Sequence, residues 1–370
     1  MYIKKINLIN FKNYTETDLS FSPQINIFVG PNGAGKTNLL DSIYCLSLTK
    51  SAFSSTEGNS IKHSENFFSI LGHFCKGENT YAVQYDLAGQ KKTFRLDKSP
   101  YEKLSEHIGS FPVVLVTPYD TDVIREGSEE RRKFFDSIIS QLDGLYLSEL
   151  IRYNNLLKQR NSLLKQFAER NTIDKELIDS YNFQILRSGK IIHEKRKIFI
   201  EEFISIFKAH YLNLSQEKEI PELVYTSQME ASDFEQKFLQ NLNKDILLQR
   251  TGMGIHKDDY EFKLSGYPVK NYGSQGQQKS FVIALKLAHF DSIKKNKNLK
   301  PILLLDDIFD KLDDERIGKL MEMVAQDAFG QLFITDARPE RTEKIFENIR
   351  AEIRIFNIEN GVISTEKQVS

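Results

Sequence analysis

Cysteine is scarce in this sequence, and long apolar runs are missing from it. The two cysteines, Cys45 and Cys75, cannot form a disulfide framework or a four-cysteine zinc site, and they indicate a reducing interior. The longest apolar stretches, such as residues 301–305, are far shorter than the roughly 20 residues that a membrane helix needs. The first residues lack the apolar core of a signal peptide. We therefore expect a cytoplasmic protein that does not enter a membrane.

A strong net charge is also absent, because 50 lysines and arginines oppose 51 aspartates and glutamates, which leaves a formal charge of -1. Any binding of nucleic acid must then use a local basic face. A hydrophobic fraction of 40% and a charged fraction of 27% are typical of globular proteins and exclude wholesale disorder. The 370 residues leave room for two domains of about 150 residues each.

Strand and helix patterns alternate at both ends of the chain but not in its middle. Short apolar strands are expected at residues 3–8, 21–29, 113–116, 302–305 and 332–335. The segment from about 128 to 210 has helical spacing instead. The pattern predicts an α/β fold in which one domain is built from both chain ends, residues 1–115 and 270–370, and a mainly helical domain, residues 116–269, is inserted.

The helical middle contains a basic stretch. Residues 151–200 include 11 lysines and arginines against five aspartates and glutamates. One interpretation is an ordinary solvated helical face, and the other is a surface that contacts phosphates. On the second interpretation the candidate contacts include Lys195, Arg196 and Lys197, together with a lysine-rich turn at residues 294–300.

The most specific motif is a phosphate-binding loop of the pattern G-x-x-x-x-G-K-[ST]. Its residues are Gly30, Pro31, Asn32, Gly33, Ala34, Gly35, Lys36 and Thr37. An apolar strand precedes the loop and a helix follows it, so backbone N–H groups and the helix N-terminus can surround an anion. Lys36 is expected to reach the β- and γ-phosphates, and the Thr37 hydroxyl to hold Mg²⁺. The loop predicts binding of a nucleoside triphosphate, ATP.

Two aspartates follow the apolar strand at residues 302–305. Ligand chemistry in α/β sheets gathers at the C-terminal ends of strands. We therefore expect Asp306 to hold the Mg²⁺ and Asp307 to act as the catalytic residue that polarises the attacking water. A second polar turn, Phe309-Asp310-Lys311-Leu312-Asp313, comes shortly afterwards.

A third motif opens the helix expected at residues 281–290. It comprises Ser274, Gln275, Gly276 and Gln277. A turn of this kind can present a hydroxyl, N–H groups and a positive dipole end to an anion, or it can simply cap the helix. The chain's own phosphate loop already surrounds one anion, so the turn is better explained if it closes over ATP held by a second copy.

These motifs together resemble the ABC-type P-loop ATPase heads of the SMC and Rad50 class. In their short form, without a sustained heptad run between Thr37 and Ser274, they resemble the RecF family. The likeness covers nearly the whole chain. It includes Asn10-Phe11-Lys12-Asn13-Tyr14, the segment SEERRKFFD at 128–136, the segment GIHKDD at 254–259 and YGSQGQQKS at 272–280.

The resemblance implies a DNA-binding protein of recombinational repair, replication restart and the SOS response. It implies an ATP-dependent homodimer in which the Ser274 turn of one subunit completes the ATP site of the other. It also implies action at single-stranded gaps and junctions, on single-stranded and gapped double-stranded DNA, alongside RecR and RecO. Turnover is left open by the residues; the resemblance implies a weak, DNA-stimulated ATPase.

The sequence departs from ABC heads at two positions, and one cluster invites a metal interpretation. No glutamine follows the strand at 113–116, and Thr335-Asp336 stands where such heads often have a histidine. His256, Asp258 and Asp259 lack the spacing of a zinc site, and the resemblance implies a structural or lid role for them.

Three other functions remain open at this point. A metabolic P-loop kinase would transfer phosphate without DNA but would leave the Ser274 turn unexplained. An ATPase-coupled nuclease would need a further acidic metal-binding domain, for which little chain remains after Asp336. A DNA clamp that binds ATP without hydrolysing it would show no turnover.

Overall fold

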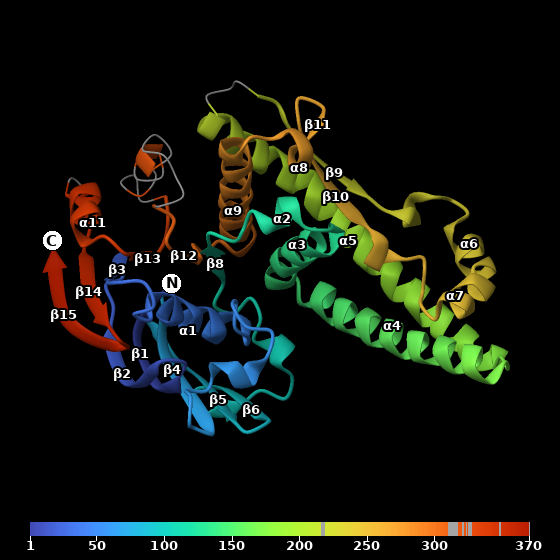
Figure 1. Cartoon of the computed structure of the whole chain (residues 1–370), viewed down its shortest axis with the longest axis horizontal. Coiled ribbons are helices and arrows are strands. Elements are labelled where there is room, and N and C mark those ends of the chain that lie inside the picture. Colours follow the sequence, from blue (N-terminus) through green and yellow to red (C-terminus); the bar gives the residue numbers. More distant parts are fainter. Residues whose placement is uncertain are drawn as a thin grey trace. The chain divides into compact units, whose positions relative to one another are not determined.

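The computed structural model describes residues 1–215, 219–309, 317–319, 322, 324, 328–347 and 349–369. It divides the chain into two compact units, Met1–Asp120 with Lys286–Ser370, and Thr121–Leu285 (Figure 1). The polar turn expected after Phe309 lies outside the described residues from position 310 to 313. No helix in the described part of the chain has both the length and the apolar character to cross a membrane.

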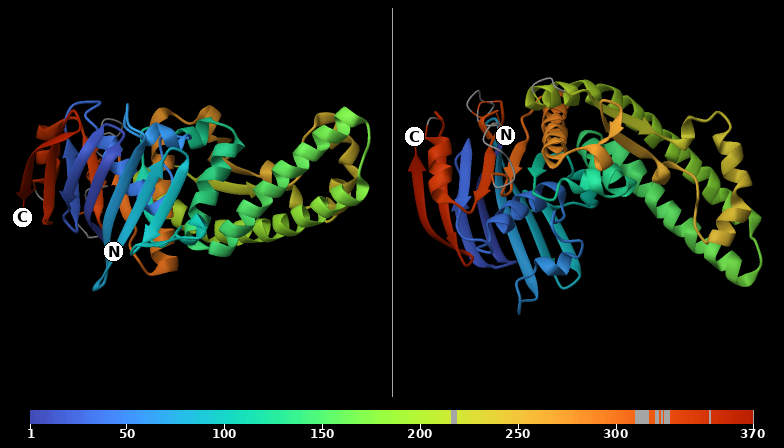
Figure 2. Two further views of the ribbon diagram at one scale, coloured as in Figure 1. Left: turned by 90° about the horizontal axis from the view of Figure 1, so that it is seen from below. Right: turned by 45° about the horizontal axis from the view of Figure 1, so that its top comes forward.

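The first unit contains two six-stranded sheets. Its elements are β1 (Tyr2–Phe11), β2 (Tyr14–Ser20), β3 (Ile25–Val29), α1 (Lys36–Leu48), β4 (Phe67–Lys76), β5 (Asn79–Ala88), β6 (Lys91–Leu96), β7 (Ser99–Pro100), β8 (Val113–Val116), β12 (Ile302–Leu305), β13 (Leu332–Asp336), α11 (Pro339–Phe346), β14 (Ile353–Glu359) and β15 (Val362–Val369). One sheet is antiparallel throughout, in the order β2-β1-β4-β5-β6-β7, and its long strands run side by side in Figure 2.

The other sheet positions the loops that matter for function. Its order is β15-β14-β3-β13-β12-β8, with β14, β3, β13, β12 and β8 parallel and β15 antiparallel at one edge. The strands β3, β12 and β13 are buried along their whole length, as expected for parallel strands that are covered on both faces. Because these strands are parallel, the residues that follow β3, β12 and β13 all lie at the same side of the sheet, where the C-terminal ends of the strands are found.

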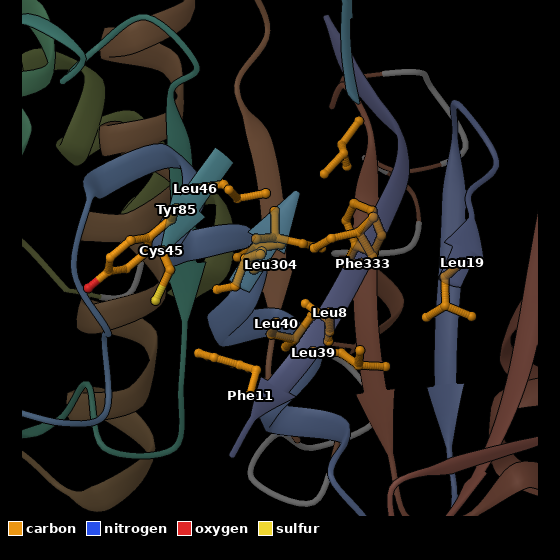
Figure 3. Packing of buried hydrophobic residues seen from close by; sticks show 14 of the residues in the cluster. Leu8, Phe11, Leu19, Leu39, Leu40, Cys45, Leu46, Tyr85, Leu304 and Phe333 are labelled. Carbon is orange, nitrogen blue, oxygen red and sulfur yellow. The ribbon is translucent and has the colours of Figure 1, made fainter. Parts of the chain in front are cut away.

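The main core of the first unit lies around α1. Leu39, Leu40 and Leu46 of that helix pack in one cluster with Leu8 of the antiparallel sheet and with Phe333 of the parallel sheet (Figure 3). All five side chains are buried. The start of α1 is therefore fixed against both sheets.

The second unit is mainly helical. Its elements are α2 (Asp122–Arg125), α3 (Ser128–Leu142), α4 (Gly144–Arg170), α5 (Lys175–Ser215), β9 (Pro221–Thr226), α6 (Phe234–Gln240), α7 (Leu242–Leu248), β10 (Asp259–Leu264), β11 (Tyr267–Pro268) and α8 (Val269–Tyr272). The helix α9 (Gln275–Lys297) begins in this unit and ends in the first. Tyr153, Leu156, Ile185 and Ile192 join α4 to α5 in a shared core. The three strands form a small antiparallel sheet.

Two local expectations were wrong, and one strand was missed. The single strand expected at residues 21–29 begins only at Ile25, because Ser22 turns the chain: its amide donates to Asn26 Oδ1 at 2.8 Å and Asn26 Nδ2 donates back to Ser22 O at 2.8 Å. The strand β2, at Tyr14–Ser20, had not been expected. The lysine-rich turn does not exist at positions 294–297, because α9 continues through Lys297.

Candidate nucleotide-binding site

The phosphate-binding loop connects β3 to α1, and its glycines are required by its backbone. Gly30, Gly33 and Gly35 have φ angles of 148°, 81° and 115°, a region that other residues rarely adopt. A Cβ atom at Gly30 would lie 2.1 Å from the carbonyl oxygen of Ile358 on the neighbouring strand β14. Gly35 precedes α1 and has no side chain to cap the first turn, so the N–H groups there can bind an anion.

Side chains at the turn between β1 and β2 hold the backbone of this loop by hydrogen bonds. Asn13 Nδ2 donates to the carbonyl oxygen of Ala34 at 3.0 Å, and Tyr14 Oη donates to that of Gly35 at 3.1 Å. Asn38 in the first turn of α1 donates through Nδ2 to Asn13 Oδ1 at 2.7 Å. In the sequence, Asn13 and Tyr14 contribute only to the family likeness; their contact with the loop is visible in the structure alone.

Lys36 is the cation of the site. Its ammonium group donates to the carbonyl oxygens of Gly30 at 2.7 Å and Pro31 at 2.9 Å, and the residue is 7% exposed. Burial lowers the pKa of Lys36, and the nearby carboxylates of Asp307 and Asp306 oppose that shift. The ammonium group is thus held over the loop, where phosphate oxygens would complete its hydrogen bonds.

Two threonines meet Asp306 at the end of β12. Thr37 Oγ1 and Thr335 Oγ1 both donate to Asp306 Oδ1 at 2.8 Å. Asp306 is 4% exposed; burial raises its pKa, and the hydrogen bonds from Thr37 and Thr335 oppose the rise. A hydroxyl oxygen and a carboxylate oxygen side by side next to the loop are ligands of the kind that Mg²⁺ prefers, so the residues fit that ion.

A cavity of about 160 Å³ opens over the loop. It is lined by Asn32, Gly33, Gly35, Lys36, Thr37, Asn38, Asp307 and Thr335. The cavity brings the expected catalytic Asp307 together with Lys36 and Thr37, although 270 positions separate Thr37 from Asp307 in the chain. Asp307 has a positive φ of 47°, which is uncommon for aspartate and fixes the direction of the chain as it leaves β12.

The Ser274 turn lies in the second unit and caps α9. The amide of Ser274 donates to Gln277 Oε1 at 2.6 Å, and the amide of Gln277 donates to Ser274 Oγ at 3.2 Å, which is a reciprocal capping box. Gln277 Nε2 also donates to Glu219 Oε1 at 2.6 Å. Ser274 and Gln275 are exposed, and the side chain of Gln278 is turned inward to the carbonyl oxygens of Val269 and Gly273.

Comparison with known proteins decides the family. A family model described as the RecF/RecN/SMC N terminal domain matches residues 2–364. The DNA replication and repair protein RecF of Cytophaga hutchinsonii is 51% identical over 363 residues, which cover 98% of this chain and 96% of that protein. The RecF protein of Flavobacterium johnsoniae is 48% identical, with 97% of this chain and 100% of that protein covered. The chain belongs to the RecF family.

Solved structures agree with this membership. The recombination mediator protein RecF-ATP in the RecFOR pathway matches with a TM-score of 0.90 and 26% identity, over 100% of this chain and 98% of that one. An Smc head domain from Pyrococcus furiosus matches with a TM-score of 0.57 and 18% identity, over 100% of this chain and 96% of that one, which shows the fold alone. The expected fold class, an ABC-type ATPase head of α/β architecture, is confirmed. Membership in the RecF family also replaces the kinase and nuclease interpretations.

In this RecF-family chain, Thr335 and Asp336 have different surroundings. Thr335 lines the cavity, whereas Asp336 does not. The fully buried Asp336 carboxylate accepts from Thr342 Oγ1 at 2.7 Å, from Arg341 Nε at 3.1 Å and from the amide of Arg338 at 3.1 Å. Asp336 therefore anchors α11 to the end of β13, and of the two residues at the expected histidine position, Thr335 is the one that lines the site.

In the loop after β8, where ABC heads carry a glutamine, the polar groups are also engaged in hydrogen bonds and an ion pair within the protein. The amide of Thr117 donates to Asp120 Oδ2 at 2.6 Å. Lys286 of α9 pairs with Asp120 Oδ1 at 2.7 Å and donates to the carbonyl oxygen of Leu115 at 2.6 Å. The polar groups of this loop thus fasten α9 to the end of β8.

The GIHKDD segment of this RecF-family chain is part of a buried network. Asp258 accepts from Arg196 Nη1 at 2.9 Å and from Tyr225 Oη at 2.5 Å. His256 Nδ1 lies 2.8 Å from Tyr153 Oη, and His256 Nε2 lies 3.0 Å from the carbonyl oxygen of Thr251. Burial lowers the pKa of His256 to about 4. Among the residues that the structure describes, no group of three or more His, Cys, Asp or Glu could hold a metal ion.

The same network corrects the expected phosphate contacts. Arg196 is 1% exposed and is paired with Asp136 at 2.9 Å and with Asp258, so it cannot contact DNA from the surface. Lys195 is half-buried and pairs with Asp143. Only Lys197 of the three is exposed. The count of charges in the sequence overstated the basic surface because it could not separate paired, buried cations from exposed ones.

Proposed function

We propose that this RecF-family chain binds ATP with Mg²⁺ and acts as an ATP-dependent DNA-binding protein in DNA replication and repair. The observation that carries the proposal is the hydrogen bond from Thr37 to Asp306, which joins the phosphate-binding loop to the end of β12 beside Lys36. The names of the relatives and the related structure with ATP support the same role and ligand here.

Each side chain of the cavity has a distinct task in this proposal. Lys36 and the N–H groups at the start of α1 bind the terminal phosphates. Thr37 and Asp306 hold the Mg²⁺, which supplies positive charge to the phosphate oxygens when it is bound. Asp307, on the cavity wall, orients the attacking water and accepts its proton. We propose slow hydrolysis that DNA stimulates.

We also propose that ATP joins two copies of the chain. The exposed Ser274 turn, at the N-terminus of the 23-residue helix α9, would bind the γ-phosphate held by the other subunit, and Gln275, Gly276 and Gln277 would complete that contact. A ligand that contacts both subunits favours the dimer by mass action. ADP lacks the γ-phosphate and would favour the dimer much less.

The DNA-related part of the proposal rests on family membership. We propose that the unit built from both chain ends is the ATPase domain and that the inserted helical unit is a lid or arm. The dimer would bind single-stranded and gapped double-stranded DNA at gaps and junctions, in recombinational repair, in the SOS response and in replication restart, with RecR and RecO as partners in the cytoplasm. The structure of a RecF protein in the RecFOR pathway supports this context.

Nucleotide binding is tested by calorimetry with ATP and Mg²⁺. Lys36→Ala removes the ammonium group that faces the phosphates, and we expect at least about ten-fold weaker ATP binding, since a hydrogen bond to a charged group contributes about 1.5–3 kcal/mol. Lys4→Ala, at an exposed position on β1, is the matched control and should bind ATP like the wild type. Equal ATP affinity in all three proteins would contradict the assignment of the loop.

Assembly is tested by analytical ultracentrifugation of Asp307→Asn, which should bind ATP without turning it over. We expect a dimer with ATP and a monomer with ADP. Adding Ser274→Arg should preserve ATP binding but abolish the dimer, because the longer side chain occupies the place of the phosphate. Ser205→Arg, at an exposed position on α5, is the control and should still form the dimer. A monomer at micromolar concentration and saturating ATP would contradict the composite site.

A further inference from the structure

Thr335 lies at the C-terminal end of β13 and is fully buried. Its hydroxyl group makes two hydrogen bonds, one to each of the two aspartates that follow β12. It donates to Asp306 Oδ1 at 2.8 Å and accepts from the backbone N–H of Asp307 at 2.8 Å. A single hydroxyl group thus connects the side chain of one aspartate with the backbone of the next.

The directions of these bonds are fixed by chemistry. The amide of Asp307 can only donate, so the Thr335 oxygen accepts there and its one proton is directed to Asp306. Thr37 donates to the same Oδ1 atom at 2.8 Å. The two hydroxyl groups therefore hold the Asp306 carboxylate from both sides, one from α1 and one from β13.

The bond to Asp307 fixes a backbone conformation. Asp307 has a φ of 47°, in the left-handed region that aspartate adopts only occasionally. Its N–H group is held by Thr335, and its side chain lines the cavity beside Lys36 and Thr37. Without the acceptor on Thr335, the Asp307 amide would lose its partner at a partly buried position, and the backbone would be freer to leave this conformation.

The neighbouring residue does not share this task. The carboxylate of Asp336 is engaged by Thr342 and Arg341 of α11, as described above. Among the residues at the end of β13, Thr335 alone lines the cavity. The end of this strand therefore acts on the site through a hydroxyl group, in the region where other ABC heads often have an imidazole.

We propose that Thr335 is a positioning residue for ATP binding and hydrolysis, because its hydroxyl group sets the orientation of the Asp306 carboxylate and the backbone of Asp307 together. This inference rests on the proposed function, in which Asp306 holds Mg²⁺ and Asp307 orients water. It predicts that Thr335 matters for the Mg²⁺-dependent part of ATP binding and for turnover, and not for the contacts that the loop makes with phosphates.

The test compares three substitutions at this position with one control. Thr335→Val removes the hydroxyl group at nearly constant volume, Thr335→Ser retains it, and Thr335→Ala paired with Thr335→Ser isolates the hydroxyl group if the valine variant does not fold. Thr342→Val is the matched control, because Thr342 is a fully buried threonine on α11 whose hydroxyl group donates to a different carboxylate, that of Asp336, at 2.7 Å.

ATP affinity is measured by calorimetry with Mg²⁺ and again with EDTA, and turnover is measured at saturating ATP with Mg²⁺. In the wild type, Mg²⁺ should increase the affinity for ATP over that in EDTA. For Thr335→Val and Thr335→Ala we expect this increase to be smaller by at least about ten-fold, which is the effect of losing one hydrogen bond to a charged group. Affinity in EDTA should stay at the wild-type value. Turnover should fall more than the apparent KM rises, while Thr335→Ser and Thr342→Val should keep wild-type values.

The outcomes separate this inference from the proposed function. If the wild type does not bind ATP, the proposed function fails. If the wild type binds and hydrolyses ATP and Thr335→Val does so equally, the positioning role alone is wrong. A loss of affinity by the same factor with Mg²⁺ and with EDTA would also overturn it, because Thr335 would then act through the loop or the fold. An equal loss in Thr342→Val would overturn it as well, because the effect would then be a general one of buried hydroxyl groups.

Discussion

Substitution of Arg196 by methionine should destabilise the second unit strongly, whereas the same change at the next residue should not. Arg196 is 1% exposed and donates to Asp258 Oδ2 at 2.9 Å, to the carbonyl oxygen of Ile255 at 2.9 Å and to Asp136 Oδ2 at 3.0 Å. Lys197 is exposed on the same helix. The two residues have the same charge and adjacent positions, so they differ mainly in burial.

The magnitude follows from what the substitution leaves behind. Removing one partner of a buried ion pair typically costs about 3–5 kcal/mol, because the other charge stays buried without compensation. Burial already raises the pKa of Asp258, and Arg196 opposes that rise. Without Arg196 the carboxyl group of Asp258 can take up a proton, which limits the cost, so we expect about 3 kcal/mol. A surface change such as Lys197→Met should stay within about 0.5 kcal/mol.

The assay needs a signal from the second unit alone. The chain has no tryptophan, so a single Phe199→Trp, in the partly buried layer against the core of α4 and α5, reports on that unit by fluorescence during urea unfolding. In this background we compare Arg196→Met, Lys197→Met and Arg196→Met combined with Asp136→Asn and Asp258→Asn.

The triple variant should recover part of the lost stability, because it removes both carboxylates that Arg196 had compensated. Equal free energies of unfolding for Arg196→Met and Lys197→Met would refute the reasoning. A triple variant less stable than Arg196→Met would show that the cost comes from lost packing and not from uncompensated charge.

Three further predictions concern the loop, pH and DNA. Gly35→Ala should weaken ATP binding more than Gly33→Ala, since a Cβ at Gly35 would lie 2.4 Å from Asn13 Nδ2 and one at Gly33 meets nothing within 4 Å; equal affinities by calorimetry would contradict this. Burial lowers the pKa of His107 to about 4, so the unfolded chain binds its proton first as the pH falls, and stability is lost between about pH 6.5 and pH 4. Between pH 7 and pH 5, the free energy of unfolding measured in urea should fall by about 2 kcal/mol more for the wild type than for His107→Gln. Equal losses in the two proteins would contradict the burial of His107 as the cause. DNA affinity should fall steeply with salt, and Lys197→Glu should flatten the plot of log affinity against log salt; an unchanged slope would remove Lys197 from the DNA-contacting surface.

The sequence by itself determined the features that depend on local spacing. The loop from Gly30 to Thr37 needs three glycines and a lysine at fixed positions before a helix, and the structure has the strand, the positive φ angles and the helix start there. The apolar strand before Asp306 could be read in the same way, because full burial leaves a continuous apolar run. The family likeness also followed from short motifs in a fixed order along the chain, and comparison confirmed it.

Contacts between distant segments were decided only by the tertiary structure. Asp306 meets Thr37 across 269 positions because β3, β13 and β12 lie next to each other in parallel, and no local pattern specifies that order. The bond from Asn13 to Ala34 has the same origin, since the antiparallel sheet brings its first turn against the loop.

The burial of individual charged side chains was also decided only by the tertiary structure. The sequence counted Lys195, Arg196 and Lys197 as one basic group. Successive residues on a helix point about 100° apart, so the fold turned Arg196 into the network of Asp136 and Asp258 and left Lys197 on the surface. The physical reason is that local spacing fixes which residues share a helix face, whereas the packing of other segments decides which face is covered and which charges find partners.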